Sequence, residues 1–179
     1  MLDLRLLSAS DLPSHRDEML DVYRDAYADK IANAFFAEQR YWDRVEAYAE
    51  REGFGLVMGY VRGEGLVGYA LGYPLPASSR WWAGLVTPVE PSLTEETGRR
   101  TFALNYVMTR RAYRRRGIAR ALHDALMHSR TEERATLLVL PDNVAAVSAY
   151  RAWGWEKIGE LRPFDDAPKY DAMILKLAD

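Results

Sequence analysis

Arginine residues concentrate in the segment 110–120, which holds six arginines, one glycine and no acidic residue. Within it, the motif Arg114-Arg-Arg-Gly117-Ile-Ala119 follows a run of alternating apolar residues and precedes residues with helical apolar spacing. The first N–H groups of a helix lack intrahelical partners, and the helix dipole favours negative charge there. Gly117 has no side chain, so the backbone can approach a ligand closely. The motif therefore predicts an anion site.

The charge distribution favours a compact anion over an extended one. The whole chain has a net charge of −2. Since the segment 110–120 supplies six positive charges, the remaining residues together carry −8. Nucleic acids usually require a broad basic face. We therefore expect no nucleic acid among the partners.

A second polar constellation lies in the segment 140–155, Leu-Pro-Asp-Asn-Val-Ala-Ala-Val-Ser-Ala-Tyr-Arg-Ala-Trp-Gly-Trp. Asn143 and Tyr150 are seven residues apart, or two helical turns, so they share one face of a helix. Asn143 is also a good helix N-cap, and Tyr150 also suits a buried core position. A structural role is compatible with a functional one for both residues.

The elements expected around these segments follow the order β-α-α-β-β-β-α-β-α-β-β. Ser14 and Asp17 are expected to cap the first helix, and residues 74–100 form a long loop, with room for short structure of its own. The pair Trp81-Trp82 in this loop is suited either to an acceptor pocket or to a dimer interface. The predicted strands are 2–6, 54–61, 66–73, 101–109, 135–140, 155–161 and 170–177, and the predicted helices include 117–129 and one that carries Trp42, Val45, Tyr48 and Ala49.

The two motifs, in this order and with one helix and one strand between them, resemble the signatures of the GNAT superfamily of acyl-CoA-dependent N-acyltransferases. The resemblance covers roughly residues 101–160. It implies a single GNAT-type domain over residues 1–179. It also implies an α/β (α+β) fold, in which about four helices flank a mixed, mostly antiparallel central sheet with a splayed parallel pair of strands.

The resemblance further implies acetyl-CoA as co-substrate and assigns roles to individual residues. In the family, the turn binds the CoA pyrophosphate, the strand end pairs with the pantetheine amides, the matching Asn binds the pantetheine arm, and the matching Tyr assists departure of the thiolate as the catalytic residue. In this chain these are Arg114, Arg115, Arg116, Gly117, Ile118, Ala119 and Arg120 of the turn, Val107, Met108 and Thr109 of the strand end, Asn143, and Tyr150.

The general base is not identified by the sequence. Some relatives carry a Glu on the strand before the turn, whereas this chain has Asn105 and Tyr106 there. A chain of water molecules is one alternative. The carboxylates that remain as candidates are Glu90, Glu95, Glu96, Asp165 and Asp166.

We thus expect an N-acetyltransferase that transfers the acetyl group of acetyl-CoA to a primary amine of a small molecule or peptide by direct attack; the alternative is an inactive acyl-CoA-binding sensor or partner module. No metal is expected, because the chain has no cysteine and His123 and His128 do not share a helix face. No signal peptide or membrane-spanning stretch is apparent, which favours a cytoplasmic protein without a membrane partner. The family resemblance also allows a homodimer.

Overall fold

The computed structural model describes residues 1–177. The element order is the predicted one, with several short helical turns added. The strands are β1 (Leu2–Leu7), β2 (Gly55–Val61), β3 (Gly65–Pro74), β4 (Thr101–Thr109), β5 (Arg134–Val139), β6 (Glu156–Leu161) and β7 (Tyr170–Lys176). The α-helices are α1 (Arg16–Ala26), α2 (Glu38–Ala49), α3 (Pro91–Thr94), α4 (Ile118–His128) and α5 (Val144–Ala152). Short 3-10 helices cover Ala9–His15, Ala34–Phe36, Trp81–Gly84 and Arg111–Tyr113.

The described strands follow the hydrogen-bonded order β1-β2-β3-β4-β5-β7-β6. Strand β4 pairs with β5 in parallel, and the ladders of β1 with β2, β2 with β3, β5 with β7, and β6 with β7 are antiparallel. The β4–β5 ladder joins only Thr101–Ala103 to Arg134–Thr136, although β4 continues to Thr109. This mixed sheet with one parallel pair and four main helices confirms the predicted fold class.

The residues group into two compact units, which we describe separately. One contains Met1–Tyr73 and Leu104–Arg130, and the other contains Pro74–Ala103 and Thr131–Asp179. The single domain expected over residues 1–179 stays a prediction, and its last two residues lie outside the described part of the chain.

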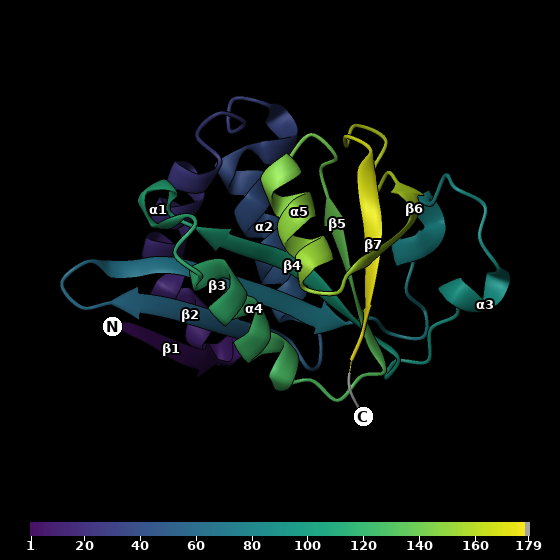
Figure 1. The fold of residues 1–179 in the computed structure, drawn as a ribbon, viewed down its shortest axis with the longest axis horizontal. Coiled ribbons are helices and arrows are strands. Elements are labelled where there is room, and N and C mark those ends of the chain that lie inside the picture. Colours follow the sequence, from purple (N-terminus) through teal and green to yellow (C-terminus); the bar gives the residue numbers. More distant parts are fainter. Residues whose placement is uncertain (178–179) are drawn as a thin grey trace. The chain divides into compact units, whose positions relative to one another are not determined.

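In the first unit, helices cover both faces of the strands β1–β3. Helix α4 lies on one face, and α1 and α2 lie on the other (Figure 1). The buried core between α1, α2 and the strands includes Met19, Tyr23, Tyr41, Leu56 and Tyr69. On the opposite face, Gly59 makes room for α4, since a Cβ at this position would lie 3.2 Å from the Leu122 side chain.

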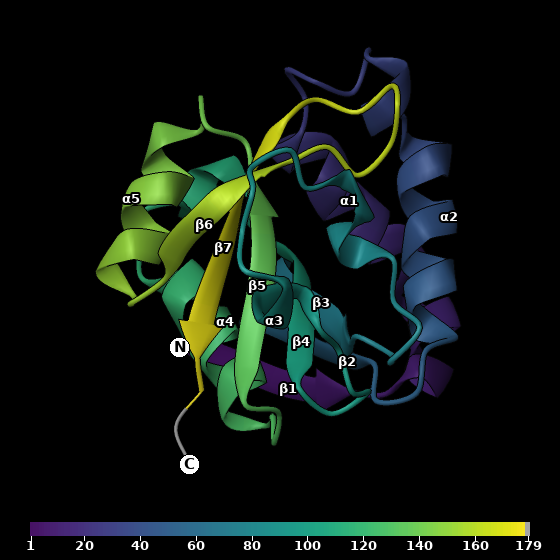
Figure 2. The same ribbon diagram turned by 90° about the vertical axis from the view of Figure 1, so that its right-hand side faces the viewer.

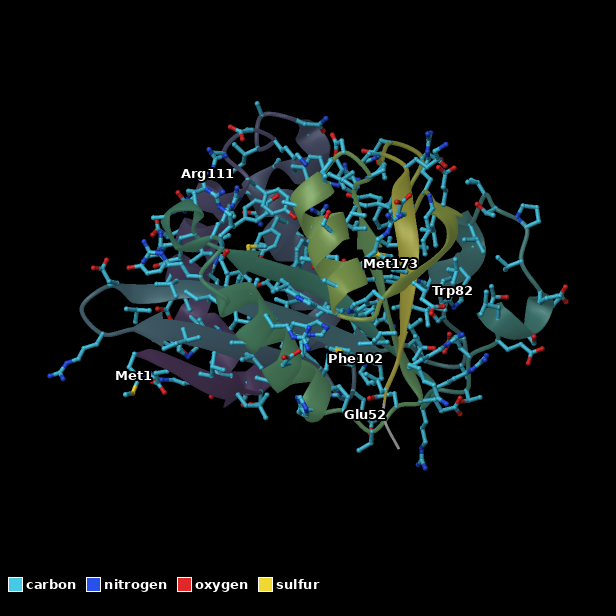
Figure 3. The ribbon with its side chains drawn as sticks, in the orientation of Figure 1. Met1, Glu52, Trp82, Phe102, Arg111 and Met173 are labelled. Atoms are coloured by element: carbon cyan, nitrogen blue, oxygen red, sulfur yellow. The ribbon has the colours of Figure 1, made fainter. Side chains whose placement is uncertain are left out.

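The second unit places α5 beside the strands β5, β7 and β6 (Figure 2). Strand β5 pairs along its whole length with β7, which in turn pairs with β6. Its buried residues include Trp82, Phe102 and Met173, which are labelled in Figure 3. The run 135–140 was predicted as a buried strand, and β5 is almost entirely buried.

Two local expectations change in the structure. Ser14 does not cap α1, because its hydroxyl donates to the carbonyl of Asp11 and the N-cap position belongs to His15. The capping box instead pairs Ser8 with Asp11 at the start of the preceding 3-10 helix. The segment 74–100 contains the two short helices Trp81–Gly84 and Pro91–Thr94, as the sequence analysis allowed.

Candidate functional site

The arginine-glycine turn adopts a backbone that leaves its N–H groups open. Gly117 is the N-cap of α4 with φ of +76°, and Arg115 also has a positive φ, of 59°. A Cβ built on Gly117 would have no atom within 4 Å. The N–H groups of Ile118 and Ala119 belong to the first turn of α4 and have no carbonyl of their own helix to bond. The turn thus has the open donors and left-handed residues of a backbone anion site.

Helix α1 holds the start of this turn through Arg110. The Arg110 guanidinium donates to the carbonyl of Leu66 at 2.8 Å and to the Asp21 carboxylate at 2.5 Å. The Arg110 N–H donates to the carbonyl of Val67 at 2.8 Å. Arg110 therefore ties the end of β4 to both β3 and α1.

The next residues of the turn are also bound to α1 and the segment after it. The Arg111 N–H donates to the Asp25 carboxylate at 2.6 Å, and the Arg111 side chain pairs with Asp29 at 2.9 Å. Arg111 is labelled at this place in Figure 3. Arg114 donates to the carbonyl of Ala26 at 3.2 Å. Arg114, predicted to bind phosphate, thus also has a positioning role.

The contacts of these three aspartates with the turn were not predicted from the sequence. Asp21, Asp25 and Asp29 are spaced by four residues, so a helix brings the first two to one face and the third follows on the same side. This spacing, together with the cluster of arginines elsewhere in the chain, is the sequence feature that could have indicated these contacts. The aspartates neutralise Arg110 and Arg111, so fewer arginines of the cluster remain for a ligand than the sequence suggested.

The later arginines of the turn differ in their partners. Arg115 is exposed and forms no ion pair with another residue of the described chain. The Arg116 guanidinium lies over the Tyr113 ring, 5.0 Å from its centroid. Arg120 pairs with Asp124 four residues on, at 2.6 Å. Arg115 and Arg116 are therefore the side chains best placed to add charge-assisted bonds to an anion held by the backbone.

The strand end leading into the turn is in the same unit. Val107 is half-buried, and Met108 and Thr109 are buried. On one side, β4 packs tightly against β3, since a Cβ on Gly68 would come within 2.5 Å of the Met108 carbonyl oxygen. Away from β3, residues 104–109 take part in no strand ladder formed by residues 1–177. This free backbone edge can accept an extended amide-bearing ligand as an added strand.

Asn143 and Tyr150 lie in the second unit. Asn143 caps α5, because its side-chain oxygen accepts from the Ala146 N–H at 3.2 Å. The structural alternative for Asn143 is thus confirmed, and its remaining amide N–H groups stay available. The Tyr150 ring meets Trp153 and Trp155 edge-on, with centroids 5.5 and 6.0 Å away.

The environment of Tyr150 keeps its phenol neutral. Burial raises the pKa of Tyr150 well above the ordinary value of 10.0. Tyr150 is half-buried, and no hydrogen bond within residues 1–177 contributes to this shift. Tyr150 thus offers a protonated O–H as a hydrogen-bond donor.

Glu96, one of the candidate bases, is instead a buried anchor. Its side chain is 2% exposed. One carboxylate oxygen, Oε1, accepts from Trp82 Nε1 at 2.9 Å, Thr101 Oγ1 at 2.8 Å and Arg134 at 3.0 Å. This network attaches the segment 74–100 to β4 and β5. Glu96 is thus bound within this network and is a poor candidate for the base. Trp82 is buried in the core of this unit.

The other candidate bases, Glu90, Glu95, Asp165 and Asp166, are exposed. His123 is buried beside Asp124, at 2.8 Å, and burial lowers the pKa of its imidazole. Within residues 1–177, no group of three or more potential ligands could hold a metal ion. None of the helices described is both long and apolar enough to cross a membrane.

A comparison with protein families shows to which family the chain belongs. Residues 16–155 match the model of the Acetyltransferase (GNAT) family. The chain belongs to the GNAT acetyltransferase family. Members of this family are N-acetyltransferases that use acetyl-CoA. A comparison with curated proteins found no significant match.

Solved structures with the same fold have distant sequences. A GNAT acetyltransferase from Staphylococcus aureus superposes with a TM-score of 0.70 at 12% identity, covering 99% of this chain and 100% of that one. The Escherichia coli ribosomal-protein-S18-alanine N-acetyltransferase gives 0.62 at 18% identity, covering 100% and 96%. The PaiA N-acetyltransferase of Thermoplasma acidophilum, solved with coenzyme A, gives 0.59 at 12%, covering 98% and 99%. At these identities the likeness concerns the fold alone.

Proposed function

We propose that this GNAT protein transfers the acetyl group of acetyl-CoA to a primary amine of a small molecule or peptide, by direct attack of the amine on the thioester. The observation that carries the proposal is the turn at Gly117. Its left-handed backbone, open N–H groups and adjacent exposed arginines fit a pyrophosphate group. A neighbour of the same fold binds coenzyme A.

The assigned residues divide the binding of acetyl-CoA between them. The N–H groups of residues 115–120 bind the pyrophosphate, and Arg114, Arg115 and Arg116 add charge. The free edge at Val107, Met108 and Thr109 pairs with the pantetheine amides, and an N–H on this edge polarises the acetyl carbonyl. The amide of Asn143 donates to the pantetheine arm while its oxygen caps α5.

Tyr150 assists departure of the thiolate chiefly as a hydrogen-bond donor. An ordinary phenol has a pKa of about 10 and a thiol about 8.5, so full proton transfer is already uphill by about 2 kcal/mol. Burial raises the pKa of Tyr150 further, which makes complete transfer less favourable still. A neutral O–H aimed at the developing thiolate stabilises it without changing protonation state.

The acceptor is a primary amine that is cationic when free. Outside the segment 110–120 the chain carries a net charge of −8, which favours the approach of a cation. One structural neighbour acts on an alanine of a ribosomal protein, a peptide amine. The proposal therefore covers both amine-bearing metabolites and peptide amines, with no nucleic acid or membrane as partner.

The binding half of this proposal is tested by thermal unfolding with and without acetyl-CoA. At a hundred times Kd, the ligand should stabilise the native chain by about 2.7 kcal/mol, or several degrees for a domain of this size. Gly117→Glu places a carboxylate at the anion site and should abolish the shift. If neither chain responds, the turn is only a solvated surface feature. If the native chain responds but releases no CoA with any amine, it is the binding module without turnover.

A further inference from the structure

Strand β1 is an edge strand that the rest of the chain leaves open. It stands at the end of the hydrogen-bonded order, and within residues 1–177 it pairs with β2 alone. Its four central residues, 3–6, are all exposed. Leu4 is 38% exposed and Leu6 is 63% exposed. An open edge of this kind is a template for pairing with another chain.

The strand at the other end of the sheet order, β6, has its outer edge covered by another segment of the same chain. The segment after the 3-10 helix Trp81–Gly84 lies along it. The Val86 N–H donates to the carbonyl of Glu160 at 2.9 Å, and the Glu160 N–H donates to Thr87 Oγ1 at 2.9 Å. Strand β6 also carries a register shift between Lys157 and Gly159. Within the described residues, no strand pairs with the outer edge of β1, and its ladder with β2 has no register shift.

The side chains of β1 divide into an apolar face and a charged face. Leu2 and Leu4 lie on the α4 face, since a Cβ on Gly59 would come within 3.5 Å of both and of Leu122. Arg5 lies on the opposite face, over the Tyr60 ring at 4.4 Å, and pairs with Asp3 at 2.9 Å. In the sequence Leu-Asp-Leu-Arg-Leu over residues 2–6, the leucines are therefore placed symmetrically about Leu4. The residue before Leu4 is negative and the residue after it is positive.

We propose that a second copy of this chain pairs with β1, edge to edge and antiparallel, about a twofold axis at Leu4. Such a contact uses the same surface on both copies, as a closed dimer requires. Leu4 then faces the partner's Leu4, and Leu2 faces the partner's Leu6. Asp3 faces the partner's Arg5, and this pair occurs twice. The ladder also supplies partners for the outward-pointing N–H and C=O groups of β1.

Charge selects this register over its neighbours. In β1, the N–H and C=O groups of every second residue point away from β2. Two identical antiparallel strands can therefore exchange hydrogen bonds only when the twofold axis passes beside a residue, so that this residue faces its own copy. An axis at Asp3 would place two aspartates face to face, and an axis at Arg5 would place two arginines face to face. Like charges directly opposite each other destabilise a strand pair. Only the axis at Leu4 brings opposite charges together.

The test is a charge exchange read by sedimentation equilibrium of the full chain. Asp3→Arg places arginine opposite arginine twice, and Arg5→Asp places aspartate opposite aspartate twice. Each single variant should weaken dimerisation roughly tenfold or more. Their equimolar mixture should form a heterodimer, because one chain then contributes only positive charge and the other only negative. The double variant Asp3→Arg/Arg5→Asp should dimerise as the native chain does.

Two variants with the same changes in charge serve as controls. Glu52→Arg and Arg62→Asp alter exposed residues outside β1, and neither should affect the dimer. Met1 and Glu52 are labelled in Figure 3. A native chain that stays monomeric at high concentration would refute the proposal. So would a dimer that persists unchanged in both single variants, because it would use another surface. Recovery on mixing shows that the single variants are folded.

Discussion

Gly117→Ala is expected to weaken acetyl-CoA binding for a reason that can be separated from its effect on stability. Gly117 has φ of +76°, in the left-handed region that costs a residue with a Cβ about 1–2 kcal/mol. No atom lies within 4 Å of the added methyl group, so no steric cost is added. For a chain of this size, this loss lowers Tm by about 2–8 °C.

Gly63→Ala is the matched control for this variant. Gly63 has φ of +82° in the turn between β2 and β3, and an added Cβ there also has no neighbour within 4 Å. The two variants should therefore lose similar stability. Only the methyl group on Gly117 stands at the start of α4, where it obstructs the approach of an anion to the N–H groups.

Calorimetric titration at a temperature where both variants are folded measures the difference. Acetyl-CoA should bind at least about tenfold more weakly to Gly117→Ala, a loss of about 1.4 kcal/mol, and equally well to Gly63→Ala and the native chain. Equal affinities for all three would refute the placement of the pyrophosphate. An unchanged Tm for Gly117→Ala would contradict the left-handed backbone itself.

Four further substitutions test separate parts of the structure. Tyr150→Phe should lower kcat about a hundredfold with unchanged acetyl-CoA affinity, measured by steady-state kinetics and calorimetry; an unaltered kcat would remove Tyr150 from catalysis. Burial lowers the pKa of His123 in the folded chain. The imidazole therefore binds a proton more readily in the unfolded chain, and the free energy of unfolding should fall as pH drops through about 6.5. Urea titrations across that range should show a weaker dependence in His123→Gln, and the same slope in both would contradict this origin. Arg134→Met leaves the Glu96 carboxylate buried without its ion pair and should cost about 3–5 kcal/mol of unfolding free energy, whereas Lys169→Met breaks an exposed pair and should cost less than about 1 kcal/mol.

Local patterns in the sequence predicted most of the fold. The predicted strands 54–61 and 66–73 correspond to β2 and β3, which pair antiparallel around a turn with two positive φ values. The position of Gly117 directly before a helical pattern predicted the start of α4. These features depend on neighbours within a few residues, which is why sequence spacing captures them.

Contacts between distant segments were not predictable in the same way. Glu96 was one exposed-looking carboxylate among several, and only the fold brings Trp82, Thr101 and Arg134 around it. The pairing of Asp25 with the Arg111 N–H joins residues 86 positions apart. Ser14 was chosen as a cap from its residue type, whereas the capping box formed six residues earlier, at Ser8. Type and spacing identify candidates, but they do not choose among equivalent ones.

Amine-dependent release of CoA from acetyl-CoA tests the central claim most directly. The native chain is incubated with acetyl-CoA and a panel of amine-bearing metabolites and peptides, and both the free thiol and the acetylated amine are measured. An acetyltransferase should release CoA in amounts matched by one acetyl group gained on at least one amine, and Tyr150→Phe should slow both together. Tight binding of acetyl-CoA without amine-dependent release anywhere in the panel would contradict the proposed activity.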